Sequence, residues 1–327
     1  MKVGFVILSS DEAPMLEHSL PAALADGFDE ALVIDNASTD ATAEIARRHG
    51  VERVSLERRV PYNHAMNAAL PRVSADAVAL LQADTFVTAG YRAACLESLR
   101  DPGIGSVAPK LLRTRGPHVE DRLPTIDAAG MSVDRRRKNG LVGHGAPADT
   151  YAVAAQAFGA DGAAAVYRAE TLADCAVDGE VFDENMPGWG CDADLAWRAR
   201  LLGWECRYEP RAVVHHIRTY SPTTRAHTSA RDRRTQFRNR YLMIAKNDSL
   251  RDLVGDAAPL LLYELLALGY AVLREPELLG GYAEAARRLP GALRRRRVIQ
   301  AHRRGGRVPF AMKPPAEGAA AAAPGPC

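Results

Sequence analysis

Short apolar runs alternate with helical patterns over the first hundred residues. Val3–Leu8 is a continuous apolar run, which predicts a buried strand. The pattern then repeats small and apolar side chains at helical spacing, at Met15, Leu16, Ser19, Leu20, Ala23 and Leu24. Further strands are predicted at Ala31–Ile34, Val51–Leu56 and Ala77–Leu81, with helices ending at Arg48 and spanning Asn63–Val73. This order predicts an α/β fold, with a mostly parallel sheet and helices on both of its faces.

The pattern changes twice after residue 100. Residues 101–160 are irregular, with Gly, Pro and Arg among short strand-like pieces, and a helix at Leu195–Leu202 and a strand at Arg207–Val214 follow. Long helical patterns then dominate, at Thr235–Lys246, Leu260–Arg274 and Glu277–Arg297, interrupted by Gly and Pro. We therefore predict an α/β domain over residues 1–230, a basic helical region over 231–310 and a disordered low-complexity tail over 311–327.

Two carboxylates stand where a predicted strand stops. Asp35 follows the run ALVI, and Asp84 follows AVALLQA. Ligands on such sheets bind beyond the carboxyl ends of the strands, so both side chains should line one crevice. Asp84 suits a divalent cation, because Mg²⁺ often takes one or two carboxylates together with substrate phosphates. Each residue also fits a plain turn position.

A second acidic motif, GWGCDADLAWR, contains Asp192 and Asp194 just before the helix that begins near Leu195. Acidic residues in a first helical turn are favoured by the macrodipole, so at least one of them has a structural explanation. Residues two apart on a helix point in directions roughly 200° apart, which keeps the pair from converging on one metal ion. The spacing therefore argues against Asp-x-Asp as a metal site.

His215 and His216 end the apolar run AVV. Successive strand residues point to opposite faces, so one of the two faces the crevice and the other does not. A single histidine at a strand end is more often structural than a metal ligand. A shared crevice with Asp84 would favour the ligand.

Composition narrows the classes of protein. Hydrophobic residues make up 47% and charged residues 25%, which excludes a disordered chain. The net charge of +2 hides a concentration of arginine at Arg287–Arg307. Few aromatic residues are interleaved there and no nucleic-acid motif occurs, so an interfacial membrane contact fits better than nucleic acid, with a solvated face as the plain alternative. The longest apolar stretch, Ala257–Leu273, is shorter than the ~20 residues of a spanning helix.

The pattern of cysteines and glycines argues against disulfide, zinc and nucleotide-binding loop motifs. Five scattered cysteines form no C-x-x-C motif, which favours a reducing compartment over a disulfide framework or a zinc site. The first apolar run is too short for a signal peptide. We therefore expect a cytoplasmic protein, with peripheral contact at the inner face of the cell membrane as an option. No G-x-G-x-x-G and no P-loop motif occurs, which removes the main support for dinucleotide and P-loop binding.

Taken in order, seven pieces resemble family 2 glycosyltransferases of the GT-A fold, and more narrowly the bacterial rhamnosyltransferase-like branch that builds cell-surface polysaccharides. The resemblance covers roughly residues 1–245 and includes the helical continuation. Its pieces are VIDNASTDAT (33–42), PYNHAMNAAL (61–70), ALLQADT (79–85), GAAAVYR (162–168), FDENMPGWGCDADLAWRARLLGW (182–204), PRAVVHH (210–216) and RNRYLM (238–243).

The resemblance implies a role for each matching residue. Asp84 and His216, with His215 as the fallback, would hold Mg²⁺ or Mn²⁺ at the donor diphosphate, and Asp192 would be the catalytic base. The residues implied at the nucleotide-sugar donor are Asp35, Asn36, Asn67, Gln82, Asp84, Arg238 and Arg240. Those implied at the saccharide or lipid-linked acceptor are Gly162, Trp189 and Asp194, with Asp194 also supporting the helix start.

Two positions depart from the family pattern. Gln82 stands where Asp or Asn is usual, which alters the expected ribose contact. Cys191 stands where Glu is usual, next to the implied base.

The implied reaction is inverting sugar transfer, in which a carboxylate takes the acceptor proton and a cation offsets the charge of the leaving diphosphate. We further expect the polar segment Ile217–Asp232 to fold over bound donor.

Two other functions stay open at this point. A nucleotidyltransferase that makes nucleotide sugars would share the early sheet, but the loop SSDEAP is neither glycine-rich nor basic. A non-catalytic, membrane-associated relative would explain Gln82 and Cys191 as lost chemistry. For the donor sugar, the resemblance favours dTDP-rhamnose, with a UDP-hexose as the alternative.

Overall fold

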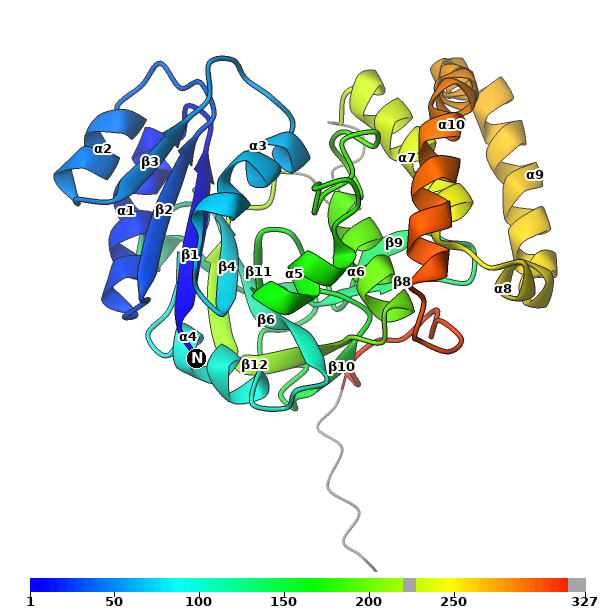
Figure 1. Ribbon diagram of the computed structural model, residues 1–327. Coiled ribbons are helices and arrows are strands. Elements are labelled where there is room, and N and C mark those ends of the chain that lie inside the picture. The colour runs from blue at the N-terminus through cyan, green and yellow to red at the C-terminus, as the bar shows by residue number, and fades with distance from the viewer. Residues whose placement is uncertain (220–227, 317–327) are drawn as a thin grey trace, which may run out of the picture.

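The first strand, β1 (Val3–Ser9), is buried along its whole length and lies inside one mixed sheet. Figure 1 shows the computed structural model of the chain, in which residues 1–219 and 228–316 are described. Strands β2 (Glu30–Asp35) and β4 (Ala77–Gln82) pair with β1 in parallel on either side, and β3 (Glu52–Ser55) continues the sheet beyond β2. The predicted parallel core is therefore confirmed, and its four strands end at the same edge.

The other half of the sheet mixes directions. Among the described residues the strand order is β10-β12-β6-β11-β4-β1-β2-β3, with β5 beside β12 and β7 beside β6. β11 is antiparallel to both β4 and β6, whereas β12 is parallel to β6. These strands are β5 (Thr85–Val87), β6 (Ile104–Thr114), β7 (Arg122–Ala129), β10 (Ala155–Ala157), β11 (Ala164–Arg168) and β12 (Glu205–His216), and a separate pair consists of β8 (Met131–Val133) and β9 (Asn139–Leu141).

Alternate residues of β1 point into two different hydrophobic cores. Phe5 and Ile7 pack on one face of the sheet, and Val6 and Leu8 pack on the other. The first core takes residues from α1 (Ala13–Ala25), α2 (Thr42–Arg48) and α4 (Tyr91–Ser98), and the second takes residues from α3 (Tyr62–Ala69), α5 (Ala169–Cys175) and α6 (Cys191–Leu201). A strand covered on both faces is continuously apolar, which explains the uninterrupted run at Val3–Leu8.

The prediction that residues 101–160 are irregular is wrong. This segment contains β6, an eleven-residue strand inside the main sheet, and β7, which pairs with it. The pairing shifts register twice between Leu111 and Thr114. Prolines and arginines in this segment hide the strand pattern, because β6 carries Pro109, Lys110 and Arg113 among its apolar residues. Neighbouring strands supply the burial that the local sequence does not indicate.

The C-terminal helices are longer than predicted. They are α7 (Ala230–Asn247), α8 (Leu250–Gly255), α9 (Ala257–Leu273) and α10 (Leu279–Ala301), and α10 runs unbroken through Pro290. Two glycines expected to interrupt this helix instead allow close packing. A Cβ atom at Gly281 would lie 3.0 Å from the Phe237 ring, and one at Gly291 would lie 2.9 Å from Asn185.

The helical region shares a third hydrophobic core with the sheet domain. Leu242 and Met243 of α7 and Ile299 of α10 pack with Phe158 and Trp197. Figure 1 shows α7, α9 and α10 gathered on the side of the molecule away from α1 and α2. Because α6 takes part in both the second and the third core, the helices are fixed to the element that carries Asp192.

Candidate functional site

Asp84 and His216 come together through the pairing of two strands. β5 is antiparallel to β12, with Thr85 opposite His216, and the Ile217 N–H donates to the Asp84 carbonyl at 3.2 Å. The Nε2 atom of His216 therefore lies 3.7 Å from Oδ1 of Asp84. His215 points to the other face, as the alternation of a strand requires. Burial, and then the charge of Arg122, lowers the pKa of His215 to about 4.

Asp127, which was not among the predicted site residues, contacts the other nitrogen of the His216 ring. Asp127 of β7 is fully buried, and its Oδ2 lies 2.8 Å from Nδ1 of His216. Burial opposes its charge, but hydrogen bonds from His144, His216 and Arg218 hold the pKa of Asp127 well below its usual range. The available signal was an Asp inside the apolar run TIDAAG, within the segment interpreted as irregular.

Arg218 extends this cluster toward Asp192 and was also missed. Its guanidinium donates to Asp127 at 2.8 Å and to Asp161 at 2.9 Å. Side chains two residues apart on a strand point to the same face. The alternation that directs His216 toward Asp84 therefore also indicates that Arg218 lies on that face. Asp161 in turn acts electrostatically on Asp192. Gly162, the residue after Asp161, donates its N–H to Asp192, so contacts connect the region of Asp84 to the first turn of α6.

Asp192 is placed as a proton acceptor. Its Oδ1 accepts from the Ala193 N–H at 2.8 Å, and its Oδ2 accepts a longer bond of 3.3 Å from the Gly162 N–H. Burial, followed by the negative charge of Asp161, raises the pKa of Asp192 to about 6. A carboxylate with a pKa near neutrality suits a general base, because it is deprotonated at pH 7 and still basic enough to take a proton.

Asp194 is a structural anchor, and the expectation that it contacts acceptor is wrong. Its carboxylate is buried and bonds Lys246 at 2.9 Å, Asn247 at 2.7 Å and Arg198 at 3.0 Å. These partners tie α6 to α7 and leave no oxygen for a substrate. Asp192 and Asp194 have separate sets of partners, as their spacing on a helix predicts.

Glu12 adds a further acidic group next to Asp84. It precedes α1, and its Oε2 accepts from the Ser10 N–H at 3.1 Å. Burial, and then the charge of Asp84, raises the pKa of Glu12 to about 7. Burial likewise raises the pKa of Asp84. Positive charges at His216 and Arg218, near Asp84, and at Arg59, near Glu12, lower these pKa values but do not outweigh burial, so a bound cation would be favourable here.

The residues present fit a divalent cation at Asp84 and His216. Oδ1 of Asp84 is buried and has no hydrogen-bond partner in the described part of the chain. A neutral His216 that donates Nδ1–H to Asp127 presents the lone pair of Nε2 to Asp84. The described residues contain no group of three or more His, Cys, Asp or Glu side chains arranged for a metal. Within the described ranges, 1–219 and 228–316, two side chains would therefore serve as ligands, with the remainder supplied from elsewhere, such as substrate or water.

Asp35 and Asn36 lie at the end of β2, and their contacts brace the loops around it. Asp35 pairs with Arg53 at 2.6 Å and accepts from the Ser38 N–H at 2.8 Å. The Asn36 amide donates to Val60 O at 2.9 Å and accepts from Val60 N at the same distance. Both residues therefore shape the crevice edge, and the implied donor contact stays a prediction.

Asn67 bonds to the backbone of Phe182, and its implied donor contact stays a prediction. Its side chain donates to Phe182 O at 2.7 Å and accepts from Phe182 N at 2.9 Å, so its amide is used to fix residues 182–184 against α3. Gln82 and Gly162 do lie together, since Gln82 Nε2 is 3.5 Å from Gly162 O. The Tyr62 hydroxyl also donates to Gly162 O, at 3.2 Å.

Arg238 and Arg240 are committed to the helical region, so the expectation that they reach the diphosphate is not supported by their contacts. Arg238 pairs with Glu284 at 3.2 Å and donates to Pro187 O. Arg240 pairs with Glu264 at 2.7 Å and lies over the Tyr263 ring. Arg218, which follows β12, is the arginine found in the cluster with Asp127 and Asp161.

Trp189 is half-buried beside the start of α7. Its indole N–H donates to Asp232 at 3.2 Å, and its carbonyl accepts from Asn239 at 2.7 Å. Its implied contact with acceptor stays a prediction. The segment Ile217–Asp232, expected to close over donor, lies partly outside the described residues, as does most of the tail 311–327. Cys191, next to Asp192, is buried, and burial raises its pKa well above the usual thiol value.

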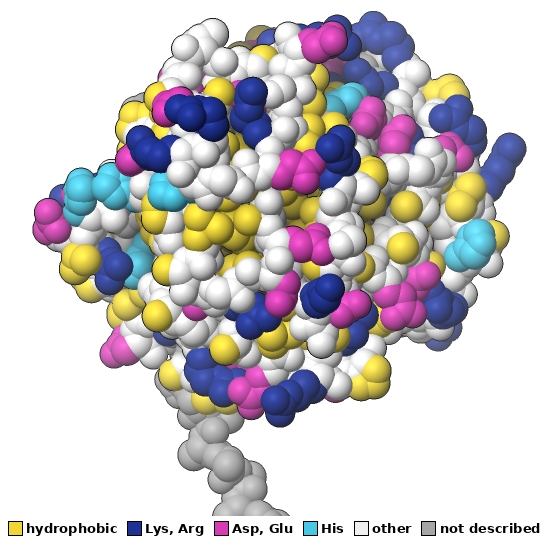
Figure 2. Space-filling view, turned by 60° about the vertical axis from the view of Figure 1, so that its left-hand side comes forward, with side chains coloured by type: hydrophobic (Ala, Val, Ile, Leu, Met, Phe, Trp, Pro, Cys, Tyr) yellow, Lys and Arg dark blue, Asp and Glu magenta, His cyan; other side chains and the backbone are white. Residues whose placement is uncertain are grey.

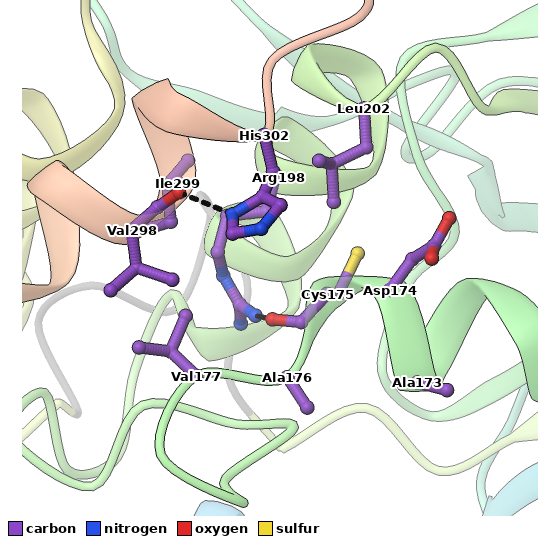
Figure 3. Close-up of a pocket in the computed structure, with 10 residues that line it drawn as sticks. All are labelled: Ala173, Asp174, Cys175, Ala176, Val177, Arg198, Leu202, Val298, Ile299 and His302. Atoms are coloured by element: carbon purple, nitrogen blue, oxygen red, sulfur yellow. Dashed lines mark hydrogen bonds between the residues drawn. The ribbon is translucent and has the colours of Figure 1, made fainter.

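A cavity of about 260 Å³ lies apart from these residues, between α5, α6 and α10. In Figure 3 Arg198 donates to the Cys175 carbonyl, and His302 bonds the Val298 carbonyl at the end of α10. Burial raises the pKa of the Cys175 thiol to about 12, so the thiol is not a nucleophile at pH 7. The polar groups of this cavity are used in packing the helices.

The comparison with protein families finds a similarity in the first half of the chain. Residues 5–157 match the sequence model described as glycosyl transferase family 2. This segment is therefore similar to glycosyltransferase family 2. A protein of Mycobacterium tuberculosis (strain H37Rv), described as an uncharacterized glycosyltransferase, is 35% identical over 140 residues, covering 37% of this chain and 63% of that protein. The chain thus spans less than two thirds of the length of this curated relative.

Solved structures share the fold. GalNAc-T7 with UDP, GalNAc and Mn²⁺ superposes with a TM-score of 0.57 at 16% identity, covering 75% of this chain and 48% of that chain. S. aureus TarS 1-349 in complex with UDP-GlcNAc gives 0.57 at 14% identity, covering 92% and 88%. Identity this low supports the fold alone. The segment similar to family 2 therefore lies in an α/β protein with a fold of GT-A type and a C-terminal helical region.

Among the described residues, no single helix has the length and apolar composition needed to cross a membrane. One bent pair of segments, Ala257–Leu273 and Pro276–Ala301, passes the same test when taken together, with a bend of 120° between them.

Proposed function

We propose that this protein is a metal-dependent inverting glycosyltransferase that moves a sugar from a nucleoside-diphosphate donor to a saccharide or lipid-linked acceptor. The observation that carries the proposal is a series of contacts between Asp192 and Asp84. Asp192 accepts from the N–H of Gly162, the residue after Asp161, and the series continues through Arg218, Asp127 and His216. It connects a proton acceptor to a candidate cation site, and sugar transfer from a diphosphate uses both.

Asp192 removes the proton of the acceptor hydroxyl in this mechanism. The hydroxyl oxygen forms a bond to the anomeric carbon while the bond from that carbon to the diphosphate oxygen breaks on the opposite face. The electron pair of the broken bond stays with the diphosphate, and the proton stays on Asp192. A positioned carboxylate contributes ~10²–10⁴-fold to such a step.

Asp84 and His216 would hold Mg²⁺ or Mn²⁺, which when bound offsets the negative charge of the diphosphate. Asp127 orients the His216 ring for this role, and Arg218 supplies a fixed positive charge between Asp127 and Asp161. Support for this choice of ion comes from GalNAc-T7, whose structure contains UDP and Mn²⁺. The pre-arranged charges need no reorganisation during the reaction.

For the donor, the sequence resemblance favours dTDP-rhamnose, with a UDP-hexose as the second choice, and it places the reaction in cell-surface polysaccharide synthesis. The structure of S. aureus TarS with UDP-GlcNAc supports a nucleotide-sugar donor as the class. A cytoplasmic location at the inner face of the membrane agrees with use of a lipid-linked acceptor.

The test is a thermal-shift screen of nucleotide sugars with and without Mn²⁺ or Mg²⁺, followed by an assay for released nucleoside diphosphate. We expect one nucleotide class to raise the melting temperature only with metal, and the same donor to be turned over. Metal-dependent binding without any turnover, with or without saccharide acceptors, would favour a binding module and overturn the enzymatic proposal.

A further inference from the structure

The outer side of α9 exposes apolar side chains along its whole length. Leu265 is 70% exposed and Leu273 is 80% exposed. The short helix α8, which precedes α9 in the sequence, exposes 74% of Leu250. We define the α8–α9 face as the exposed apolar residues of these two helices, which are Leu250, Val254, Leu261, Leu262, Leu265, Leu266, Leu268, Tyr270, Val272 and Leu273. Contiguous apolar surface of this kind marks an interaction site.

The charged residue of α9 faces the protein and leaves this surface apolar. Glu264 pairs with Arg240 of α7 at 2.7 Å and accepts a hydrogen bond from Tyr241. Its neighbour Tyr263 lies under the Arg240 guanidinium, 4.6 Å from its carbon to the ring centroid. The polar contacts of α9 therefore fix which side faces inward, and the leucines on the other side are held outward.

A groove of about 420 Å³ between α9 and α10 extends the apolar surface. Leu261, Leu265 and Leu268 line it from α9 together with Glu264, which is paired with Arg240, and Tyr282 lines it from α10. In Figure 1 α9 lies at the outer edge of the molecule, beyond α10 as seen from the sheet. The whole face is thus accessible to a large, flat partner.

The charges around this face are strongly one-sided. All seven acidic residues between positions 248 and 301 bond cations or polar groups of the protein; they are Asp248, Asp252, Asp256, Glu264, Glu275, Glu277 and Glu284. In the described part of the chain four arginines of the same segment have no side-chain partner; they are Arg251, Arg274, Arg287 and Arg297, and all are exposed.

This excess of unpaired positive charge favours an anionic partner over a second copy of the chain. Two copies joined through the face would bring the unpaired arginines together, and the acidic groups of the segment are already used. On the face brought forward in Figure 2, by contrast, acidic and basic side chains lie interspersed. An apolar surface on a segment whose unpaired charges are all arginines is complementary to lipid acyl chains under anionic headgroups.

The geometry favours lying on a bilayer over crossing it. α9 has 17 residues, or about 25 Å at the helical rise, which is less than the hydrocarbon core of roughly 30 Å. The following segment turns away by 120°. A helix of this length with one apolar side is suited to the interface between headgroups and acyl chains.

We propose that the α8–α9 face binds an anionic lipid bilayer. Its leucines enter the boundary between headgroups and acyl chains, and Arg251, Arg274, Arg287 and Arg297 contact the headgroups. The inference rests on these surface residues alone, and it does not depend on the proposed transfer reaction.

Flotation of the full chain with lipid vesicles tests this proposal. We expect binding to phosphatidylcholine vesicles that contain phosphatidylglycerol, weaker binding to phosphatidylcholine alone, and loss of the difference at high salt, because surface charges are then screened. The Leu265→Gln/Leu266→Gln variant should bind about tenfold less or weaker still. The Arg274→Gln/Arg287→Gln variant should also lose about tenfold on anionic vesicles only.

Matched controls are Val119→Gln, which changes a 68% exposed apolar residue on another part of the surface, and Arg100→Gln. Both should float like the unchanged protein, and all variants should keep their melting temperature since the altered residues are exposed. Absence of binding to anionic vesicles, or binding that the leucine pair does not weaken, would overturn the proposal. So would a lipid-free dimer in sedimentation velocity that the leucine pair converts to monomer.

Discussion

The carboxylate of Asp127 lies 2.8 Å from Nδ1 of His216 and fixes the orientation of that ring. Nε2 of the same ring lies 3.7 Å from a buried oxygen of Asp84. The two residues are 89 positions apart in the chain. The contact therefore depends on β7 and β12 both lying beside β6, and it makes Asp127 a positioning residue for the proposed cation site.

Asp127→Asn should weaken metal-dependent nucleotide binding by about 10–100-fold, because loss of the carboxylate removes the acceptor that fixes the His216 tautomer. Calorimetric titration with nucleotide in Mn²⁺ measures this, and nucleotide binding without metal serves as the internal reference. The control is Asp149→Asn, an exposed carboxylate that should have no effect. Equal metal-dependent affinities for Asp127→Asn and the unchanged protein would contradict the role of Asp127.

Asp84→Ala should abolish the metal-dependent part of nucleotide binding while the melting temperature of the free protein is kept or raised. The reason is that Oδ1 of Asp84 is a buried polar atom without a partner in the described part of the chain, so its removal relieves a desolvation cost. Thermal unfolding with and without Mn²⁺ measures both effects. A metal response that persists in Asp84→Ala would place the cation elsewhere.

Asp192→Asn should keep donor binding and lower the rate of transfer by about 10²–10⁴-fold, because the amide cannot accept the acceptor proton. Single-turnover measurement of nucleoside diphosphate release, with saturating donor, reports the chemical step. Retained turnover in this variant would move the base to another residue, and loss of donor affinity would show that Asp192 acts in binding.

The rate of transfer should rise with pH around the pKa of Asp192, which is about 6. Below that pH the carboxyl is increasingly protonated and cannot act as a base, so the rate should fall about tenfold per pH unit, and above it the rate should level off. Glu12, whose pKa is raised to about 7, also titrates in the crevice. The Glu12→Gln variant separates the two, since it should keep a midpoint near 6.

Asp194→Ala should destabilise the fold by about 3–5 kcal/mol, because it leaves the buried charges of Lys246 and Arg198 without this partner. Urea unfolding followed by circular dichroism measures the free energy of unfolding. The matched control Glu57→Ala removes an exposed carboxylate and should change that free energy by less than about 0.5 kcal/mol. A small effect of Asp194→Ala would contradict the role of Asp194 as an anchor between α6 and α7.

The elements that could be predicted from the sequence are those whose burial is visible in the local pattern of apolar residues. The runs at Val3–Leu8 and Ala77–Leu81 are continuously apolar because helices cover both faces of their strands, so they predicted β1 and β4 directly. The same alternation required His215 and His216 to face opposite sides. The spacing of Asp192 and Asp194 on a helix likewise separated their roles before any contact was known.

The contacts between polar side chains, in contrast, depend on the tertiary structure. Asp127 lies in a strand whose pairing with β6 shifts register, and Arg218, Asp161 and His144 reach it from other segments, so no local spacing connects them. Arg238 and Arg240 resembled donor ligands by position, but α10 and α9 supply Glu284 and Glu264 as partners. Local pattern reports burial along one element, whereas the cluster at Asp127 arises from strands brought together across more than ninety residues.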